Sequence, residues 1–178
     1  MARYDLTHWA RAATGAIAAL VVACATLSPS VPNGYAGPMA TLRDSMASGT
    51  HPGTDFFFLD SIDGQHVDNS LVQTTERNRH RDPVSMGLMS TPYLVERPVP
   101  AREATFHIAG RTHFPAPIQE MVHKIYRIEG DVRFAPEPDH LYVVTGELTQ
   151  TRVSVWIEDG TGHLMGNKIV LETPASRQ

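Results

Sequence analysis

Alternation of apolar and polar residues is the feature of this sequence that most restricts its fold. Between Tyr126 and Phe134, charged residues take every second position, and apolar residues take the others except Gly130. Because successive side chains of a β-strand point to opposite faces, this period of two predicts a strand with one buried face and one face in water. Gly130 within it indicates a bulge or a close approach of another backbone.

The same alternation recurs on both sides of this segment. It is found over residues 103–114, 141–148 and 153–157, and "EDGTGHLMGNKIVLE" after them predicts a hairpin with a glycine-rich tip. Short strands at a spacing of about ten residues are typical of two packed antiparallel sheets. The sequence therefore predicts an all-β chain, a sandwich of roughly seven strands.

One strand and one short helix are expected before these segments. "DFFFLDSIDG" predicts a strand that ends in a turn at Asp63 and Gly64. Phe57 lies on the opposite strand face from its two phenylalanine neighbours, so both faces of this strand are expected to be covered. Asp68 or Asn69 is placed to cap a short helix through "SLVQTTER".

The N-terminal 25 residues have the pattern of a targeting segment. Arg3 and Arg11 give a basic start, and the apolar stretch "AATGAIAALVVA" follows over residues 12–23. Twelve residues in a helix span about 18 Å, less than the roughly 30 Å hydrocarbon core of a bilayer. This length favours a signal peptide over a permanent membrane span.

The only cysteine of the chain stands at the end of this stretch, in Val21-Val22-Ala23-Cys24. These four residues resemble the lipobox of bacterial lipoproteins. The resemblance implies lipidation of Cys24, which becomes the first residue of the mature chain and anchors it in a membrane. It also implies an outer-membrane lipoprotein facing the periplasm or the surface, because Ala25 stands where an inner-membrane retention signal has Asp. Alternatively, Ala23-Cys24-Ala25 is an ordinary signal peptidase site, and the product is a soluble periplasmic or secreted protein.

These patterns divide the chain into four parts. Residues 1–23 are expected to be the lipoprotein signal peptide, 24–53 a flexible tether, 54–173 the β-sandwich domain and 174–178 a disordered tail. The tether is expected because Ser, Pro, Gly and Ala dominate it, and an irregular arm packed on the domain is the alternative. The layout resembles uncharacterised envelope lipoproteins with a small immunoglobulin-like β-sandwich domain, a likeness that carries no site residues over.

Charge and motifs bear on several classes of function. The formal net charge of -4 argues against nucleic-acid binding, which needs a basic surface. Neither Gly-x-Ser-x-Gly nor Ser-x-x-Lys occurs, so no catalytic residue is nominated. His107 and His113 would lie about 20 Å apart on one strand, too far to share a metal ion. No metal and no other cofactor are expected.

Two features are candidate contacts with a partner. "ERNRHRD" brings together Arg77, Arg79, His80 and Arg81, a cluster suited to phosphate or carboxylate groups of envelope polymers, with a solvated loop as the alternative. Trp156 points outward if the apolar residues beside it face the core, and exposed tryptophans are frequent anchors at interfaces.

Two hypotheses for function follow. The first is an exported, lipid-anchored cell-envelope protein whose β-sandwich is a non-enzymatic binding or structural module, with the membrane and an envelope protein or polymer as partners. The alternative is a soluble periplasmic or secreted hydrolase with an unrecognised active site. An enzyme predicts a deep pocket with two or more titratable groups of shifted pKa, whereas a binding module predicts a shallow apolar or basic patch.

Overall fold

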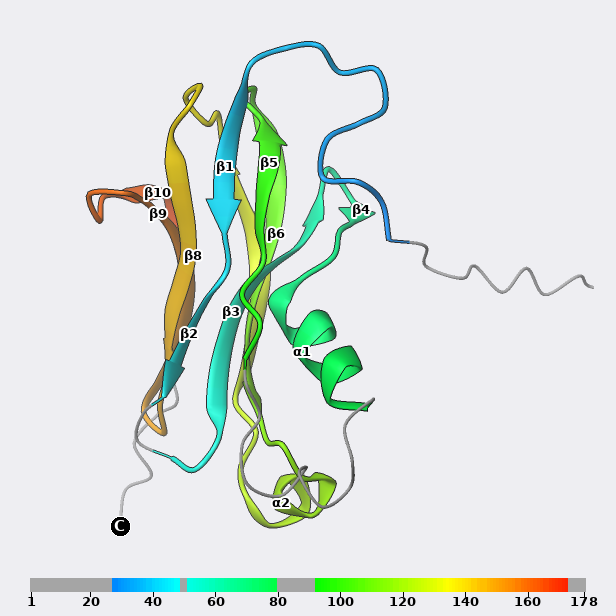
Figure 1. The fold of residues 1–178 in the computed structure, drawn as a ribbon. Helices are drawn as coiled ribbons and strands as arrows, with labels where there is room; N and C mark the ends of the chain where they lie inside the picture. Colours follow the sequence, from blue (N-terminus) through cyan, green and yellow to red (C-terminus); the bar gives the residue numbers. More distant parts are fainter. Residues whose placement is uncertain (1–26, 49–50, 80–91, 173–178) are drawn as a thin grey trace, which may run out of the picture.

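Two β-sheets pack face to face, and a helix lies against the outer face of one of them (Figure 1). The structure, a computed structural model, describes residues 27–48, 51–79 and 92–172. Its elements are β1 (Met39–Arg43), β2 (Ser45–Ser48), β3 (Thr54–Ile62), β4 (Gln65–His66), α1 (Ser70–Arg79), β5 (Glu96–Pro100), β6 (Ala104–His113), α2 (Pro117–Val122), β7 (Arg127–Phe134), β8 (Leu141–Leu148), β9 (Arg152–Asp159) and β10 (Leu164–Glu172).

The first sheet has the strand order β10-β9-β8-β1-β5, and the second has the order β2-β3-β6-β7, with β4 beside β3. All neighbours are antiparallel except β1 and β8, which run parallel. The prediction of a mostly antiparallel, two-sheet β-structure is confirmed. The chain passes from the second sheet to the first between β7 and β8, so these consecutive strands are not neighbours in one sheet. Helix α2 was not predicted from the sequence.

The predicted tether is wrong over residues 39–48, which form β1 and β2. Leu42 is fully buried in the core, at 0% exposure. The segment before β1 is also held on the domain, because the Ser28 amide donates to the His66 carbonyl over 2.7 Å and Ser30 Oγ donates to the Pro98 carbonyl over 2.7 Å. A strand of five residues in a stretch rich in proline and glycine is too short to reveal its period.

Replacing Leu42 with alanine is expected to lower the free energy of unfolding by about 2–5 kcal/mol, because it removes buried methyl groups and leaves a cavity. Leu27→Ala is the matched control, since Leu27 is 52% exposed and should change stability by less than about 0.5 kcal/mol. Urea unfolding followed by circular dichroism measures both. Equal midpoints for the two variants would contradict the burial of β1.

Asp44 lies at the point where the chain crosses from β1 in the first sheet to β2 in the second. Its carboxylate accepts hydrogen bonds from the Leu59 amide at 3.1 Å, from the amide and hydroxyl of Ser70 at 2.8 Å each, and from Arg97 Nη2 at 2.7 Å. These donors belong to β3, the first residue of α1 and β5. One buried carboxylate therefore ties the strand crossing to the helix that lies outside the sheet.

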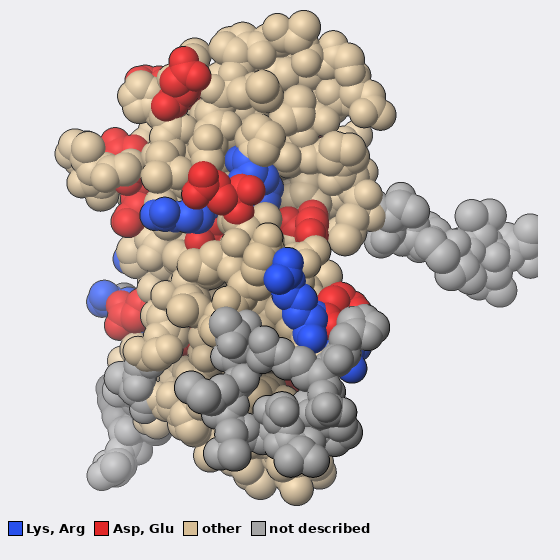
Figure 2. Space-filling model, in the orientation of Figure 1, with Lys and Arg blue, Asp and Glu red and all other residues tan. Residues whose placement is uncertain are grey.

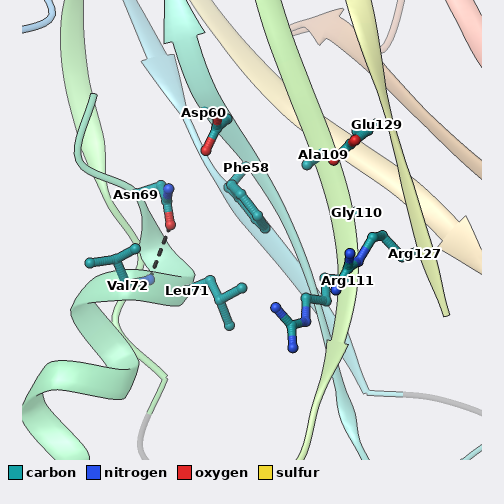
Figure 3. Close-up of a pocket in the computed structure, with 10 residues that line it drawn as sticks. All are labelled: Phe58, Asp60, Asn69, Leu71, Val72, Ala109, Gly110, Arg111, Arg127 and Glu129. Carbon is teal, nitrogen blue, oxygen red and sulfur yellow. Dashed lines mark hydrogen bonds between the residues drawn. The ribbon is translucent and has the colours of Figure 1, made fainter. Parts of the chain in front are cut away.

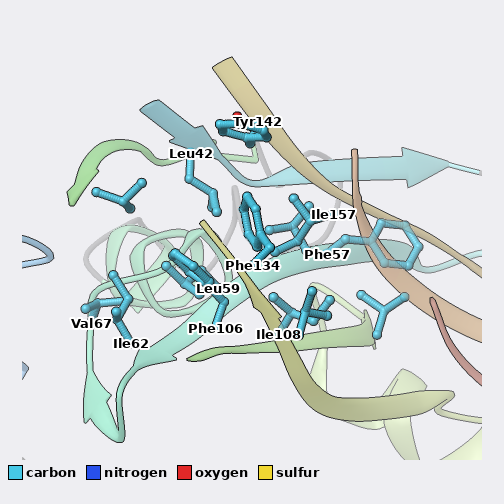
Figure 4. Close-up of a cluster of buried hydrophobic side chains, with 14 of the residues drawn as sticks. Leu42, Phe57, Leu59, Ile62, Val67, Phe106, Ile108, Phe134, Tyr142 and Ile157 are labelled. Carbon is cyan, nitrogen blue, oxygen red and sulfur yellow. The ribbon is translucent and has the colours of Figure 1, made fainter. Parts of the chain in front are cut away.

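The inner faces of both sheets supply the hydrophobic core (Figure 4). Val153, Val155 and Ile157 are all buried in it, which confirms the predicted orientation of β9. Gly130 lies close to another side chain rather than to another backbone, because a Cβ there would lie 2.7 Å from Ile169 Cδ1 of β10. Pairing between β6 and β7 is unbroken at this glycine, so there is no bulge.

Helix α1 covers the outer face of the second sheet. Phe56 and Phe58 point outward from β3 and pack with Ala109 and Leu71, so the prediction that this strand is covered on both faces is confirmed. Asn69 caps the helix as expected, since its side-chain oxygen accepts the Val72 amide over 3.0 Å.

The predicted turn between β3 and β4 is also present. Asp63 and Gly64 have φ values of 48° and 78°, the left-handed conformations that a tight hairpin of this type requires. Asp63 Oδ1 accepts the Thr105 amide over 2.9 Å, and Arg102 Nη2 donates to Asp63 Oδ2 over 2.9 Å. The carboxylate therefore holds the turn against the start of β6.

Candidate functional site

A groove runs along α1, between the helix and the outer face of the second sheet (Figure 3). It consists of three adjoining hollows of about 290, 310 and 250 Å³. Leu71, Val72 and Arg111 line both the first and the second hollow, and Arg79 and His113 line both the second and the third. The three hollows thus form one continuous surface feature, the α1 groove.

The first hollow has an apolar floor and one apolar wall. Phe58 and Ala109 come from β3 and β6, and Leu71 and Val72 come from the first turn of the helix. The sequence places them there because alternation turns Phe58 and Ala109 away from the core, and the Asn69 cap begins the helix directly above them. Apolar side chains of this kind, left at a solvent-accessible groove, are typical of binding surfaces.

Two arginines face the same hollow from adjacent strands. Arg111 of β6 and Arg127 of β7 are directly opposite each other in the strand register. Within the described residues neither side chain has a hydrogen bond or an ion pair. Asp60 and Glu129 also line this hollow, and Asp60 is paired with His66 at 2.9 Å. The first hollow therefore presents, beside an apolar floor, two arginines that the described residues leave without an ion pair.

The far end of the groove is differently charged. Arg79 donates to Glu76 over 2.7 Å, so its charge is compensated. His113 packs edge-on against Phe56, and burial lowers the pKa of His113, while the nearby Glu120 opposes this shift. This shift favours the neutral form of the imidazole. The far end of the groove is therefore lined by the His113 ring, the Arg79–Glu76 ion pair and the carboxylate of Glu120.

Carboxylates with a shifted pKa lie outside the α1 groove. Burial raises the pKa of Asp55, while hydrogen bonds from Thr112 and His51 oppose the shift. A backbone hydrogen bond from Thr105 lowers the pKa of Asp63, and hydrogen bonds from its own loop lower the pKa of Asp159 to about 2. These groups stabilise turns and strand ends.

Two of the four residues in the predicted basic cluster, Arg77 and Arg79, are described by the structure, and they have different surroundings. Arg77 lies over the ring of Tyr93, with Cζ 3.7 Å from the ring centroid, whereas Arg79 lines the groove. His80 and Arg81 lie outside the described residues, as does Cys24. Among the described members of the cluster, Arg79 alone lines the α1 groove.

Trp156 lies on the outer face of the first sheet, away from the α1 groove. Its orientation is as predicted, since its neighbours in β9 point into the core. The ring is partly covered, with Lys168 Nζ 3.5 Å from its centroid, and Nε1 donates to Glu158 Oε2 over 3.2 Å. The structure therefore places this side chain in a contact between β9 and β10.

The imidazole and carboxylate of His51 and Asp55 form a close pair at the start of β3. Their Nε2 and Oδ2 atoms are 3.0 Å apart, and Thr112 Oγ1 donates to the other carboxylate oxygen over 2.7 Å. Both side chains are largely buried, so the pair fastens the start of β3 to β6. Over the described ranges, no group of three or more His, Cys, Asp or Glu residues is arranged to hold a metal ion.

Arg111 and Arg127 are the groove residues that sequence reasoning missed. The alternation of β6 and β7 did place both on outward-facing positions. Their register across the two strands, and the helix above them, depend on pairing between distant segments. The sequence feature that could have pointed to this pair is the presence of one outward-facing arginine on each of two consecutive predicted strands.

Comparison with known proteins found no matching family model and no significant match among curated proteins or solved structures. Within the described ranges, neither helix is long and apolar enough to cross a membrane. Function is therefore inferred from the residues of this chain alone.

Proposed function

We propose that this protein is an exported, lipid-anchored cell-envelope protein whose β-sandwich, of the immunoglobulin-like type, is a non-enzymatic binding module. Its binding surface is the α1 groove, and its occupant is an envelope protein or polymer. The observation that carries the proposal is the combination in one groove of an apolar floor with two arginines that have no ion pair among the described residues. Arginine beside apolar side chains is enriched at protein interfaces.

The position of the N-terminal arm supports a close membrane anchor. Cys24 precedes Ser28 by four residues, which span at most about 14 Å of extended chain. Ser28 is held beside Val67, next to β4, through its hydrogen bond to His66. A lipid on Cys24 would therefore keep this side of the domain near the bilayer. The arm and α1 lie on the same side of the sandwich in Figure 1, so the groove would lie near the membrane surface.

The anchor is tested by the intact mass of the mature protein extracted from its native membrane, beside a Cys24→Ala variant. The expected product begins at Cys24 and carries the added mass of acyl groups, because lipidation precedes cleavage at a lipobox. The variant should stay unprocessed. A mature chain that begins at Thr26 and has no added mass would contradict the lipid anchor and would mean that the protein is exported in soluble form.

The binding surface is tested by a photo-crosslinking residue placed at Val72 in the groove wall. Val170 on β10 is the matched control, because the two side chains are similarly exposed, at 37% and 45%. A single adduct formed at Val72 and absent at Val170 is expected in cells that produce the protein. Equal yields at the two positions, or no adduct at Val72, would remove the groove as the binding surface.

A further inference from the structure

We infer that Arg111 and Arg127 form a carboxylate-binding subsite in the first hollow of the α1 groove. The occupant is an extended protein segment that places one acidic side chain, flanked by apolar or neutral residues, between the two guanidinium groups. This inference rests on the proposed function of the groove as a binding surface and adds the chemistry of the occupant.

The position of the two arginines calls for an anion. They are directly opposite each other on β6 and β7, where side chains start about 4.5–5.5 Å apart and like charges destabilise the sheet. Figure 3 shows the Arg127 side chain reaching from β7 toward β6, beside Arg111. A carboxylate between them would remove the repulsion and accept hydrogen bonds from both planar guanidinium groups.

Two pairs of charged side chains lie on the outer face of β6 and β7. His107 of β6 lies 2.7 Å from Asp131 of β7, and Arg133 Nε donates to Glu103 over 2.8 Å. Arg111, Arg127 and Glu129 differ from these residues, because the described residues provide none of them with a hydrogen bond or an ion pair. Since Asp60 is paired with His66, Glu129 leaves one negative charge for two arginines, and the remaining countercharge is assigned to the occupant of the groove.

Nearby carboxylates restrict the occupant to a single negative charge. Asp60 and Glu129 line the same hollow as the two arginines, and Glu120 lines the next. On the coloured part of the face shown in Figure 2, acidic and basic side chains are interspersed rather than gathered by sign. A polyanion or an anionic membrane surface would meet these carboxylates as well, and like charges so close together repel. A protein segment with one acidic residue avoids that repulsion.

The shape of the groove indicates where the neighbours of that acidic residue lie. Both arginines line the first hollow, and Arg111 also lines the second, so the carboxylate would lie in the first hollow. Phe58 and Leu71 line this hollow too, and Phe114 and Pro115 line the third hollow at the far end of the groove. Apolar side chains before and after the acidic residue would therefore find apolar surface in the same hollow and at the far end of the groove.

The test is selection from a displayed library of random ten-residue peptides on the full-length protein, followed by fluorescence anisotropy of the selected peptides. Selected sequences are expected to share one Asp or Glu between apolar residues. The Arg111→Gln/Arg127→Gln double variant should weaken their binding by about tenfold to 100-fold, the range expected for lost charge-assisted hydrogen bonds. Arg133→Gln is the matched control on the same sheet face outside the groove and should bind normally.

Charge exchange provides the decisive comparison. A variant with Arg111→Glu and Arg127→Glu should lose the selected peptide and bind its counterpart in which Lys replaces the acidic residue. Circular dichroism checks that each variant is folded.

Three results of these experiments would overturn the inference. They are failure to select any peptide, selection of peptides without an acidic residue, and unchanged binding by the double glutamine variant. Arginine-dependent binding to phosphatidylglycerol vesicles without peptide binding would overturn it as well, because it would identify a membrane surface as the occupant. Because crosslinking at Val72 does not depend on the arginines, the proposed binding surface can stand when this inference fails.

Discussion

Replacing Asp44 with alanine is expected to lower the free energy of unfolding by about 3–5 kcal/mol, the usual effect of breaking a buried ion pair. Asp44 is fully buried and Arg97 is 6% exposed, so the arginine would keep a buried charge without its counterion. The Leu59 amide and the Ser70 amide and hydroxyl would lose their acceptor as well. Urea unfolding of the mature chain measures the change.

Arg97 has no other described partner that could replace the carboxylate. Its Nε and Nη1 atoms are buried and make no hydrogen bond with the described residues. Adding Arg97→Met to Asp44→Ala should therefore recover part of the lost stability, because a buried pair replaced as a whole by apolar residues is often tolerated. A loss below about 1 kcal/mol for Asp44→Ala alone would show that this carboxylate does not tie β1, β3 and α1 together.

Replacing Gly146 with alanine is expected to cost about 3 kcal/mol or more, at the upper end of the range for overpacked cores. A Cβ at this position in β8 would lie 2.4 Å from Phe57 Cε1 and 2.4 Å from the Ser154 carbonyl oxygen. The ring also lies close to Gly110 of β6, where a Cβ would be 3.1 Å from Phe57 Cδ1. Phe57 therefore fills space between two glycines and has little room to move away.

Gly160→Ala is the matched control for this substitution. A Cβ at position 160 would meet only the Leu141 carbonyl oxygen, at 3.8 Å, which is an ordinary contact. The free energy of unfolding of the Gly160→Ala variant should stay within about 0.5 kcal/mol of the wild-type value. The same urea unfolding experiment compares the two variants. If Gly146→Ala unfolds at the same midpoint as Gly160→Ala, the packing between the two sheets around Phe57 is looser than described.

Features that depend on neighbouring residues were predictable from the sequence. The orientation of β9, the turn at Asp63 and Gly64, and the helix that Asn69 caps all agree with the structure. Each follows from local rules: alternation chooses the face of a strand, and short-range hydrogen bonds choose where a helix or turn begins. The same rules placed Arg111 and Arg127 on outward faces.

The tertiary structure alone decided which segments become neighbours. Residues 39–48 have too short a pattern to predict a strand, and they form β1 and β2 because β3, β5 and β8 supply backbone partners. The groove likewise depends on the register that sets Arg111 opposite Arg127 and on the packing of α1 over β3. Local patterning determines which way a side chain points, whereas the residue it meets is set by hydrogen bonding and packing between segments far apart in the chain.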